Sequence, residues 1–323
     1  MSDASAWRPT ATHNALRLRA QALRSTREFF FARQVLEVET PALVNAPVSD
    51  VNLGSVRAQM SGSDAPMFLH TSPEYAMKRL LAAGCSDIYQ ICHVYRGAER
   101  GRQHNPEFTM LEWYRLGFSL EQLMSEVADL TRALLGQVQL PVEFLSYRDA
   151  VRLHAGFDPL DADITELQRG AQALGLDATH AAKAGRDELL DLIVGAQVGP
   201  ALGAHALTFL HRYPASQAAL ARLDPADPRV ALRFELYHRG VELANGYHEL
   251  ASSAEQRMRF ATDQKVRASR GLPTFTLDPH LLAALDAGLP DCAGVALGFD
   301  RVLMLAMNAA SIDEVLAFPT ERA

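Results

Sequence analysis

The chain has 323 residues, of which 48% are apolar and 21% are charged, so it can bury a substantial core in one or two domains. Its formal net charge is −7 and it has no long run of Lys and Arg, which argues against a large nucleic-acid footprint. The N-terminus lacks the features of a signal peptide, and no apolar stretch approaches the roughly 18 residues of a membrane span. We therefore expect a cytoplasmic globular protein with no membrane partner.

The first part of the chain has the pattern of a long helix followed by short strands. Apolar residues at helical spacing cover 14–34, and alternating apolar and acidic residues up to Pro41 indicate a half-buried strand. A helix is expected at 73–83, and a capping-box pattern begins another at Ser119. Short strands are expected at 68–69, 88–91, 94–96 and 108–115.

The second part mixes helices with a hairpin. Residues 141–204 are Ala-rich with Gly and Asp breaks, which we interpret as a helical insertion packed on the main sheet. Residues 230–245 predict a strand hairpin that turns at Arg239–Gly240. Polar helices are expected to begin at Ser252 or Ser253 and at Asp278–Pro279. This order favours an α+β fold around an antiparallel sheet flanked by helices, in a single domain over 1–323.

The segment YQICHVYRGAERGRQHNPEFTMLEWYR, residues 89–115, concentrates basic, aromatic and acidic side chains. Its charges alone are also compatible with a solvated hairpin tip. Glu112 and Tyr114 are two residues apart on an expected strand, so both point to one sheet face. A carboxylate among apolar neighbours is costly unless it meets a cation, which favours a binding site.

Two later segments add candidate phosphate chemistry. In GVELANGYHEL, Glu242 and Glu249 flank the turn or bulge signal Asn245–Gly246, and paired carboxylates near a phosphate suit Mg²⁺. An exposed strand edge with ordinary acids is the alternative for this segment alone. In GVALGFDRVLML, Gly298 precedes Arg301 at a strand-to-helix junction, where an arginine suits a phosphate oxygen.

Together these segments resemble the catalytic core of class II aminoacyl-tRNA synthetases. The helix and strand ending at Pro41 resemble motif 1, VYRGAE through HNPEFTMLEWY resembles motif 2, and GVALGFDR resembles motif 3. The segments TSPEYAMKRLL, HNPEFTM and ANGYHEL are most similar to lysyl-tRNA synthetases, and the resemblance covers nearly the whole chain.

Two departures from lysyl-tRNA synthetases narrow the resemblance. Motif 1 begins near residue 16, which leaves no room for their anticodon-binding domain, and Ala296 stands where they have Gly. Both features resemble the branch of the family that loads (R)-β-lysine onto a lysine of elongation factor P and not onto tRNA. The resemblance also implies a homodimer through motif 1. Adjacent Phe29, Phe30 and Phe31 point in three directions around a helix, so one core is not expected to bury them all.

The resemblance implies ATP and Mg²⁺ as cofactors and assigns roles to individual residues. Arg96 would clamp the α-phosphate and the substrate carboxylate, and Arg301 would pair with the γ-phosphate. Glu242 and Glu249 would hold Mg²⁺. Residues expected around ATP are Arg96, Gly97, Ala98, Glu99, His104, Asn105 and Phe108, the last two at adenine, with Glu242, Leu243, Gly298 and Arg301. Residues expected around the cationic amino acid are Ser72, Pro73, Glu74, Glu112, Tyr114, Asn245, Glu249 and Ala296.

Some of these assignments have alternatives. Glu74 could instead be a helix N-terminal acid stabilised by the helix dipole. The usual motif 2 pattern is Arg-x-Glu, whereas Glu99 stands one position late and would fill that role through a shifted loop. For the whole protein, the alternatives are a free-standing synthetase that charges tRNA, a ligase of the asparagine-synthetase kind, and a catalytically inactive regulatory paralogue. The acidic pocket argues against an acidic substrate, and the retained Arg96, Arg301, Glu242 and Glu249 argue against an inactive protein.

Overall fold

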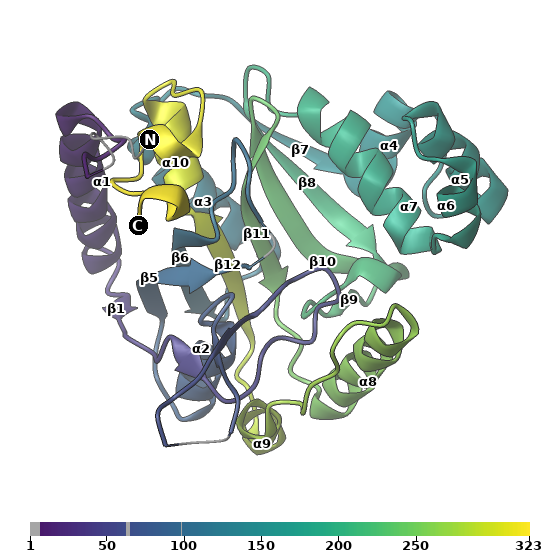
Figure 1. Ribbon diagram of the computed structural model, residues 1–323, viewed down its shortest axis with the longest axis horizontal. Helices are drawn as coiled ribbons and strands as arrows, with labels where there is room; N and C mark the ends of the chain where they lie inside the picture. Colours follow the sequence, from purple (N-terminus) through teal and green to yellow (C-terminus); the bar gives the residue numbers. More distant parts are fainter. Residues whose placement is uncertain (1–6, 63–64, 98) are drawn as a thin grey trace. The chain divides into compact units, whose positions relative to one another are not determined.

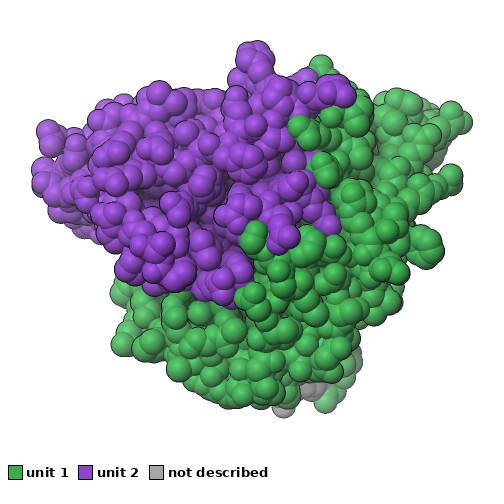
Figure 2. Space-filling view, turned by 180° about the vertical axis from the view of Figure 1, so that it is seen from behind, with its two compact units in different colours: residues 1–119, 129–138, 250–323 green, residues 120–128, 139–249 purple. Residues whose placement is uncertain are grey.

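The computed structural model describes residues 7–62, 65–97 and 99–323 (Figure 1). The chain divides into two compact units, coloured separately in Figure 2. Unit 1 contains residues 1–119, 129–138 and 250–323, and unit 2 contains residues 120–128 and 139–249. Helix α3, Leu120–Leu135, contributes residues to both. No helix in the described ranges is both long and apolar enough to cross a bilayer.

The sheet of unit 1 carries the strands that position motifs 2 and 3. Its order is β1 (Leu36–Glu37), β5 (Ile88–Tyr95), β6 (Glu107–Leu116) and β12 (Cys292–Gly298). The pairs β5–β6 and β6–β12 are antiparallel, whereas the short β1 runs parallel to β5. A small antiparallel sheet is formed by β2 (Leu43–Val44), β4 (Met67–Leu69) and β3 (Val56–Ala58).

Five helices of unit 1 accompany these strands, and most begin where the sequence predicts. Helix α1, His13–Phe31, begins at Thr12, whose side chain accepts a hydrogen bond from the Ala15 N–H. Helix α8, Ser253–Ser269, is capped by Ser252 in the same way, and α9, Pro279–Ala287, is capped by Asp278. The remaining two are α2, Glu74–Ala82, and α10, Phe299–Ala306.

Unit 2 consists of a second group of strands and a group of helices. Its strand order is β11 (Val241–His248), β10 (Asp227–His238), β8 (Leu207–Pro214) and β7 (Val142–Ser146), and β9 (Leu223–Asp224) also pairs with β10. Pairs β10–β11 and β8–β10 are antiparallel, and β7 runs parallel to β8. The helices are α4 (Tyr147–Ala155), α5 (Ile164–Ala173), α6 (Ala178–Lys183) and α7 (Arg186–Ile193), and a π-helix, Val194–Val198, continues α7. These helices pack around a core that includes Val151, Leu167, Leu189 and Ile193.

The predicted α+β class is therefore confirmed, with corrections in detail. The strand expected up to Pro41 is limited to Leu36–Glu37, and 88–91 and 94–96 belong to one continuous strand, β5. The segment 141–204 is not wholly helical, because it begins with β7, which adds an edge strand beside β8. The sequence of β7 shows little alternation of apolar and polar residues. It is a strand because it pairs with β8.

The predicted hairpin turn at Arg239–Gly240 is present. Both residues have positive φ angles, 51° and 70°, which is the backbone of a tight two-residue turn between antiparallel strands. A Cβ added at Gly240 would lie 2.8 Å from the Pro200 carbonyl oxygen, so packing as well as conformation requires glycine there. This turn fixes how β10 and β11 pair, and β11 carries Glu242 and ends at His248, directly before Glu249.

A buried carboxylate joins three of the elements that carry the motifs in unit 1. Asp300, 1% exposed on α10, accepts a hydrogen bond from the Thr109 N–H on β6 at 2.7 Å and pairs with Arg19 on α1. Arg19 also donates to the Thr109 hydroxyl at 3.2 Å and to the Val315 carbonyl at 3.1 Å. One ion pair thus holds the helix of motif 1 against the strands and helix of motifs 2 and 3.

We predict that Arg19→Met lowers the free energy of unfolding by about 3–5 kcal/mol, because it leaves the Asp300 carboxylate buried without its cation. Denaturant unfolding of the purified variant measures this change. Arg27→Met is the matched control on the same helix. Arg27 pairs with Glu37, and the two side chains are 51% and 39% exposed. Arg27→Met should therefore lower the free energy of unfolding by less than about 1 kcal/mol. Equal losses in the two variants would contradict the role of Asp300.

Candidate active site

The loop between β5 and β6 holds most of the expected phosphate contacts in unit 1. The Arg96 N–H donates to the Pro106 carbonyl at 2.8 Å, and Gly101 and His104 form an isolated antiparallel bridge inside the loop. A Cβ added at Gly97 would approach a Val56 methyl to 3.3 Å, so the chain passes β3 closely at this glycine. The loop is therefore held by its own backbone, with Ala98 outside the described residues.

The Arg96 side chain lies beside an aromatic ring and is suited to bind an anion. Its guanidinium carbon lies 5.1 Å from the centroid of the Phe108 ring, and its Nη1 pairs with Glu99 at 3.6 Å. Its Nε is buried and makes no hydrogen bond in this structure. A buried donor without an acceptor is costly, so this N–H is suited to an oxygen of a bound anion. Glu99, although one position late in the motif, does reach Arg96.

Arg301 and His104 form the second basic group of unit 1. The side chain of Arg301 lies in the first turn of α10, directly after β12 and Gly298, which confirms the strand-to-helix junction. Its Nη2 lies 2.7 Å from the Nε2 of His104. Because a guanidinium only donates, His104 accepts through Nε2 and is neutral in this contact. Burial, followed by the charge of Arg301, holds the pKa of His104 below its usual value, and Glu99 opposes this.

Asn105 makes contacts that the sequence did not suggest. Its side chain is buried, its amide NH₂ donates to the Glu107 carbonyl at 2.6 Å, and its Oδ1 accepts from the Thr320 N–H and hydroxyl, both at 3.2 Å. The amide therefore holds the C-terminal 3-10 helix, Thr320–Arg322, against the loop. The adenine contact expected of Asn105 stays a prediction, and it would require the amide to exchange these bonds.

The acidic group of unit 1 is built around Glu112 on β6. Glu112 is 2% exposed, and its two carboxylate oxygens accept hydrogen bonds from the Ser72 and Tyr114 hydroxyls, each at 2.7 Å. The Ser72 hydroxyl also accepts from the Glu74 N–H at 3.0 Å, at the start of α2 just after Pro73. Ala296 lies directly opposite Glu112 in the β6–β12 pairing, so its methyl is on the same sheet face. The structure thus gathers five of the residues expected around the amino acid.

Glu74 has a partner that the sequence reading missed. The buried Lys78 ammonium, 2% exposed, lies 2.6 Å from the Glu74 carboxylate, one helical turn later on α2. The i, i+4 spacing of the two residues was the available signal. Because Lys78 is buried, the pair is better placed to fix the direction of Glu74 than a surface pair would be.

In unit 2 a β-bulge in the hairpin decides which acidic side chains share a face. Tyr237 pairs with Glu242 and Leu236 pairs with Ala244, so Leu243 is an extra residue in β11. Beyond the bulge, Asn245 and Tyr247 face the same side of the strands as Glu242. Strict alternation would have placed Glu242 and Glu249, which are seven residues apart, on opposite faces.

Glu249 follows the last residue of β11 and stays in extended pairing. It forms an isolated antiparallel bridge with Ala221, and it is 4% exposed. The bulge therefore lets the alternation continue from Glu242 through Asn245 and Tyr247 to Glu249. On the same face, Asn245 Oδ1 accepts from Arg233 at 3.3 Å and its NH₂ donates to the Tyr247 hydroxyl at 3.0 Å.

Among the residues that the structure describes, no three or more His, Cys, Asp or Glu side chains are grouped so that they could hold a metal ion. Mg²⁺ is usually held by one or two carboxylates together with substrate phosphates. Carboxylates directed to one face of β11 fit that mode of binding.

Comparison with known proteins identifies the family of the chain. The family model of class II tRNA synthetases (D, K and N) matches residues 4–322. The elongation factor P–(R)-β-lysine ligase of Klebsiella pneumoniae strain 342 is 49% identical over 327 residues, and the ligase of the same name from Salmonella dublin is 47% identical, each alignment covering 100% of both chains. The chain therefore belongs to the class II tRNA synthetase family and, within it, to the group formed by these elongation factor P–(R)-β-lysine ligases.

The contact between His104 and Arg301 predicts the direction in which substitutions shift the pKa of His104. We predict that Arg301→Gln raises the pKa of His104, because it removes a positive charge that opposes protonation. Glu99→Gln should lower the same pKa, because it removes the carboxylate that favours the charged ring. An NMR titration of the histidine ring protons measures both shifts. Shifts of the same sign in the two variants would contradict the contact.

Proposed function

We propose that this protein is an AMP-forming ligase that activates (R)-β-lysine with ATP and transfers it to the ε-amino group of a lysine on elongation factor P. The observation that carries the proposal is the 49% identity, over the full length of both chains, to a ligase of that name. The two basic groups and the acidic group of unit 1 supply the contacts that such a reaction needs.

In the activation step, the substrate carboxylate would attack the α-phosphate of ATP and expel pyrophosphate. An ionised carboxylate needs no general base, so the protein contributes position and charge. Arg96 has a buried Nε–H for a phosphate or carboxylate oxygen, and Phe108 beside it offers a ring face to the adenine. Neutral His104 holds Arg301 at Nη2 and leaves the guanidinium charge for an outer phosphate.

Glu242 and Glu249 are the residues we propose for Mg²⁺. The ion would neutralise charge on the phosphates. Glu242 is half-buried and Glu249 is buried, and the bulge in β11 turns both toward one face. Leu243 and Gly298, also expected near ATP, are respectively the bulge residue of β11 and the last residue of β12.

The amino-acid pocket would use the acidic group of unit 1. The substrate carries two ammonium groups, and the Ser72 and Tyr114 hydroxyls orient the Glu112 carboxylate that would face one of them. Lys78 would fix Glu74 for the second ammonium group.

We further propose a cytoplasmic homodimer that contacts its partner through α1. Phe30 is fully buried in the protein's own core, whereas Phe31 is 86% exposed at the end of the helix. Leu36 on β1 is also exposed. This apolar end of α1 is suited to a second copy of the chain.

Loss of either proposed phosphate arginine should be measurable before any transfer. We predict that Arg96→Ala and Arg301→Ala each reduce ATP–pyrophosphate exchange about a hundredfold or more, which corresponds to roughly 3 kcal/mol of transition-state stabilisation. Glu249→Gln should raise the magnesium concentration that exchange requires. Near-normal exchange in either arginine variant would refute the assigned role, and absence of exchange in the parent protein would favour the inactive-paralogue alternative.

The transfer step separates this proposal from tRNA charging. Purified protein with ATP and (R)-β-lysine should add one β-lysyl mass to a lysine of elongation factor P, and mass spectrometry detects the adduct. The adduct should survive mild alkali, because it is an amide, and it should form faster as pH rises toward the lysine pKa of about 10.4. Replacing the acceptor lysine by arginine is the control. Charging of tRNA without labelling of the protein would overturn the proposal.

The choice between isomers should depend on Ala296. Its methyl lies on the sheet face of Glu112, where it would crowd an amino group on the α-carbon more than one on the β-carbon. We predict that Ala296→Gly increases the use of α-lysine relative to β-lysine by about tenfold, within the roughly 1–3 kcal/mol that one methyl can contribute. Pyrophosphate exchange with each isomer measures this ratio, and an unchanged ratio would show that the methyl does not face the substrate.

A further inference from the structure

A cavity of about 150 Å³ lies within unit 2 and includes none of the residues assigned above to ATP, magnesium or the amino acid. It is lined by side chains from α4, α7, β8 and β10, with the π-helix Val194–Val198 contributing to one wall. π-Helical turns are rare and often occur at functional sites. The polar lining side chains are Tyr147, Asp191, Tyr213, Arg233, Glu235 and Tyr237.

Two buried tyrosines lie side by side on the cavity. Tyr147 and Tyr213 are 1% and 3% exposed, and their ring centroids are 4.8 Å apart. The Tyr213 hydroxyl is directed to the Glu235 carboxylate, whereas the Tyr147 hydroxyl forms no hydrogen bond in the structure. Buried polar groups in native proteins are normally paired, so an unpartnered Tyr147 hydroxyl on a cavity indicates an occupant.

The other polar groups of the lining are already engaged. Arg233 donates to Glu235 at 2.6 Å and to the Gln217 carbonyl at 2.8 Å, and its guanidinium lies 4.2 Å from the centroid of the Tyr213 ring. The Tyr237 hydroxyl donates to the second oxygen of Glu235 at 2.7 Å. These contacts hold Arg233, Glu235 and Tyr237, and they leave the Tyr147 hydroxyl and the phenol oxygen of Tyr213 as acceptors for a ligand.

The charges of the lining favour a cation. Asp191 and Glu235 contribute two negative charges and Arg233 one positive charge, which leaves one negative charge. Burial, together with the neighbouring carboxylates, raises the pKa of Tyr147 and of Tyr213, so both phenols are neutral at pH 7. An anion would meet two carboxylates, whereas a neutral molecule would leave the charge unbalanced.

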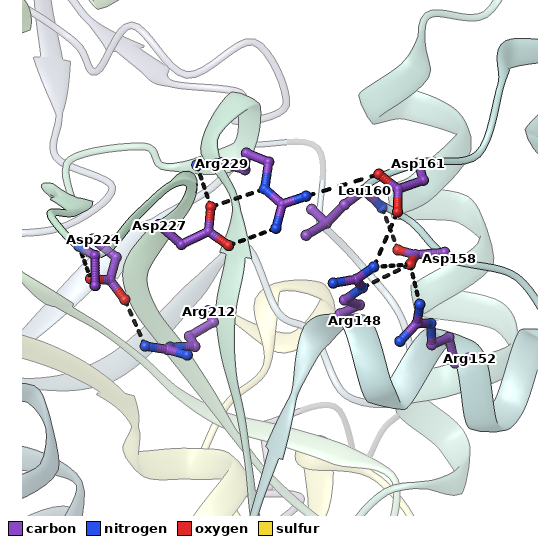
Figure 3. A network of polar contacts seen from close by, with 10 residues as sticks. Arg148, Arg152, Asp158, Leu160, Asp161, Arg212, Asp224, Asp227 and Arg229 are labelled. Atoms are coloured by element: carbon purple, nitrogen blue, oxygen red, sulfur yellow. Dashed lines mark hydrogen bonds and ion pairs between the residues drawn. The ribbon is translucent and has the colours of Figure 1, made fainter.

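The wall that carries Tyr147 is anchored to β10 by a network of ion pairs (Figure 3). Arg148, the next residue on α4, pairs with Asp158 and Asp161. Arg229 on β10 approaches Asp161 to 4.0 Å and pairs with Asp227 at 2.9 Å. This network links the helical and strand walls of the cavity independently of its lining.

We propose that this cavity binds a small primary alkylammonium ion. The ammonium group donates to the phenol oxygens of Tyr147 and Tyr213, and its positive charge balances the lining. The tyrosine rings pack against the alkyl part and attract the cation through their faces. The proposal concerns a site separate from the one that activates the amino acid.

Isothermal titration of the full-length protein with n-butylammonium tests the proposal. Saturable binding is expected, with no binding of n-butanol or butyrate, which have similar size without the positive charge. The variant Tyr147→Phe/Tyr213→Phe keeps both rings and should weaken binding at least tenfold. The melting temperature of this variant without ligand should change little, because removal of the unpartnered Tyr147 hydroxyl offsets loss of the Tyr213–Glu235 hydrogen bond.

Glu112→Gln is the matched control, because butylammonium could also enter the acidic pocket of unit 1. This variant should keep the binding that the double tyrosine variant loses. Three results would overturn the proposal. The first is no saturable binding of butylammonium, which would mean that the cavity holds water, and the second is equal binding of butanol. The third is loss of binding in Glu112→Gln with retention of binding in the double tyrosine variant. If the double variant is unstable, the single variants Tyr147→Phe and Tyr213→Phe give the same comparison.

Discussion

The pairing of Asp300 with Arg19 is the interaction on which the arrangement of unit 1 depends. It joins α1, β6 and α10, and Asp300 also takes the N–H of Thr109. The residues beside this pair are the ones with proposed chemistry, since Arg301 follows Asp300 and Phe108 precedes Thr109. A buried carboxylate is stable only with such partners, so the same contact that satisfies its charge also sets the position of two side chains that we propose for ATP binding.

The buried acids of unit 1 are fixed in direction by neighbouring side chains. Glu74 pairs with the Lys78 ammonium one helical turn away, and the Glu112 carboxylate accepts hydrogen bonds from the hydroxyls of Ser72 and Tyr114. A carboxylate that is oriented by its partners before binding loses little further freedom when a ligand arrives. This is the property that the proposed amino-acid site requires of both acids.

Unit 2 uses one arginine to connect two regions. Arg233 holds Glu235 and the Gln217 carbonyl at the tyrosine-lined cavity, and it also donates to Asn245 on the candidate catalytic strand. Burial lowers the pKa of the Arg233 guanidinium, but the negative charge of Glu235 and of other neighbouring groups outweighs burial and keeps the pKa above its usual value, so the charge is permanent. Arg233 therefore contacts both the cavity and β11. A substitution or a bound ligand at either of them would act on this one side chain.

The sequence by itself determined the α+β class, the starts of α1, α8 and α9, the hairpin turn at Arg239–Gly240, and the family. These features depend on local caps, turn residues and uninterrupted motifs. It also placed Glu112 and Tyr114 on one face, since two residues apart is enough on any strand. It did not reveal the partner of Asp300, which lies 281 residues away at Arg19. Nor could it show that β11 carries a bulge at Leu243, because the extra residue is defined only by pairing with β10. Tertiary structure decided that Glu242 and Glu249 face the same way, because strand register is a property of two strands and not of one.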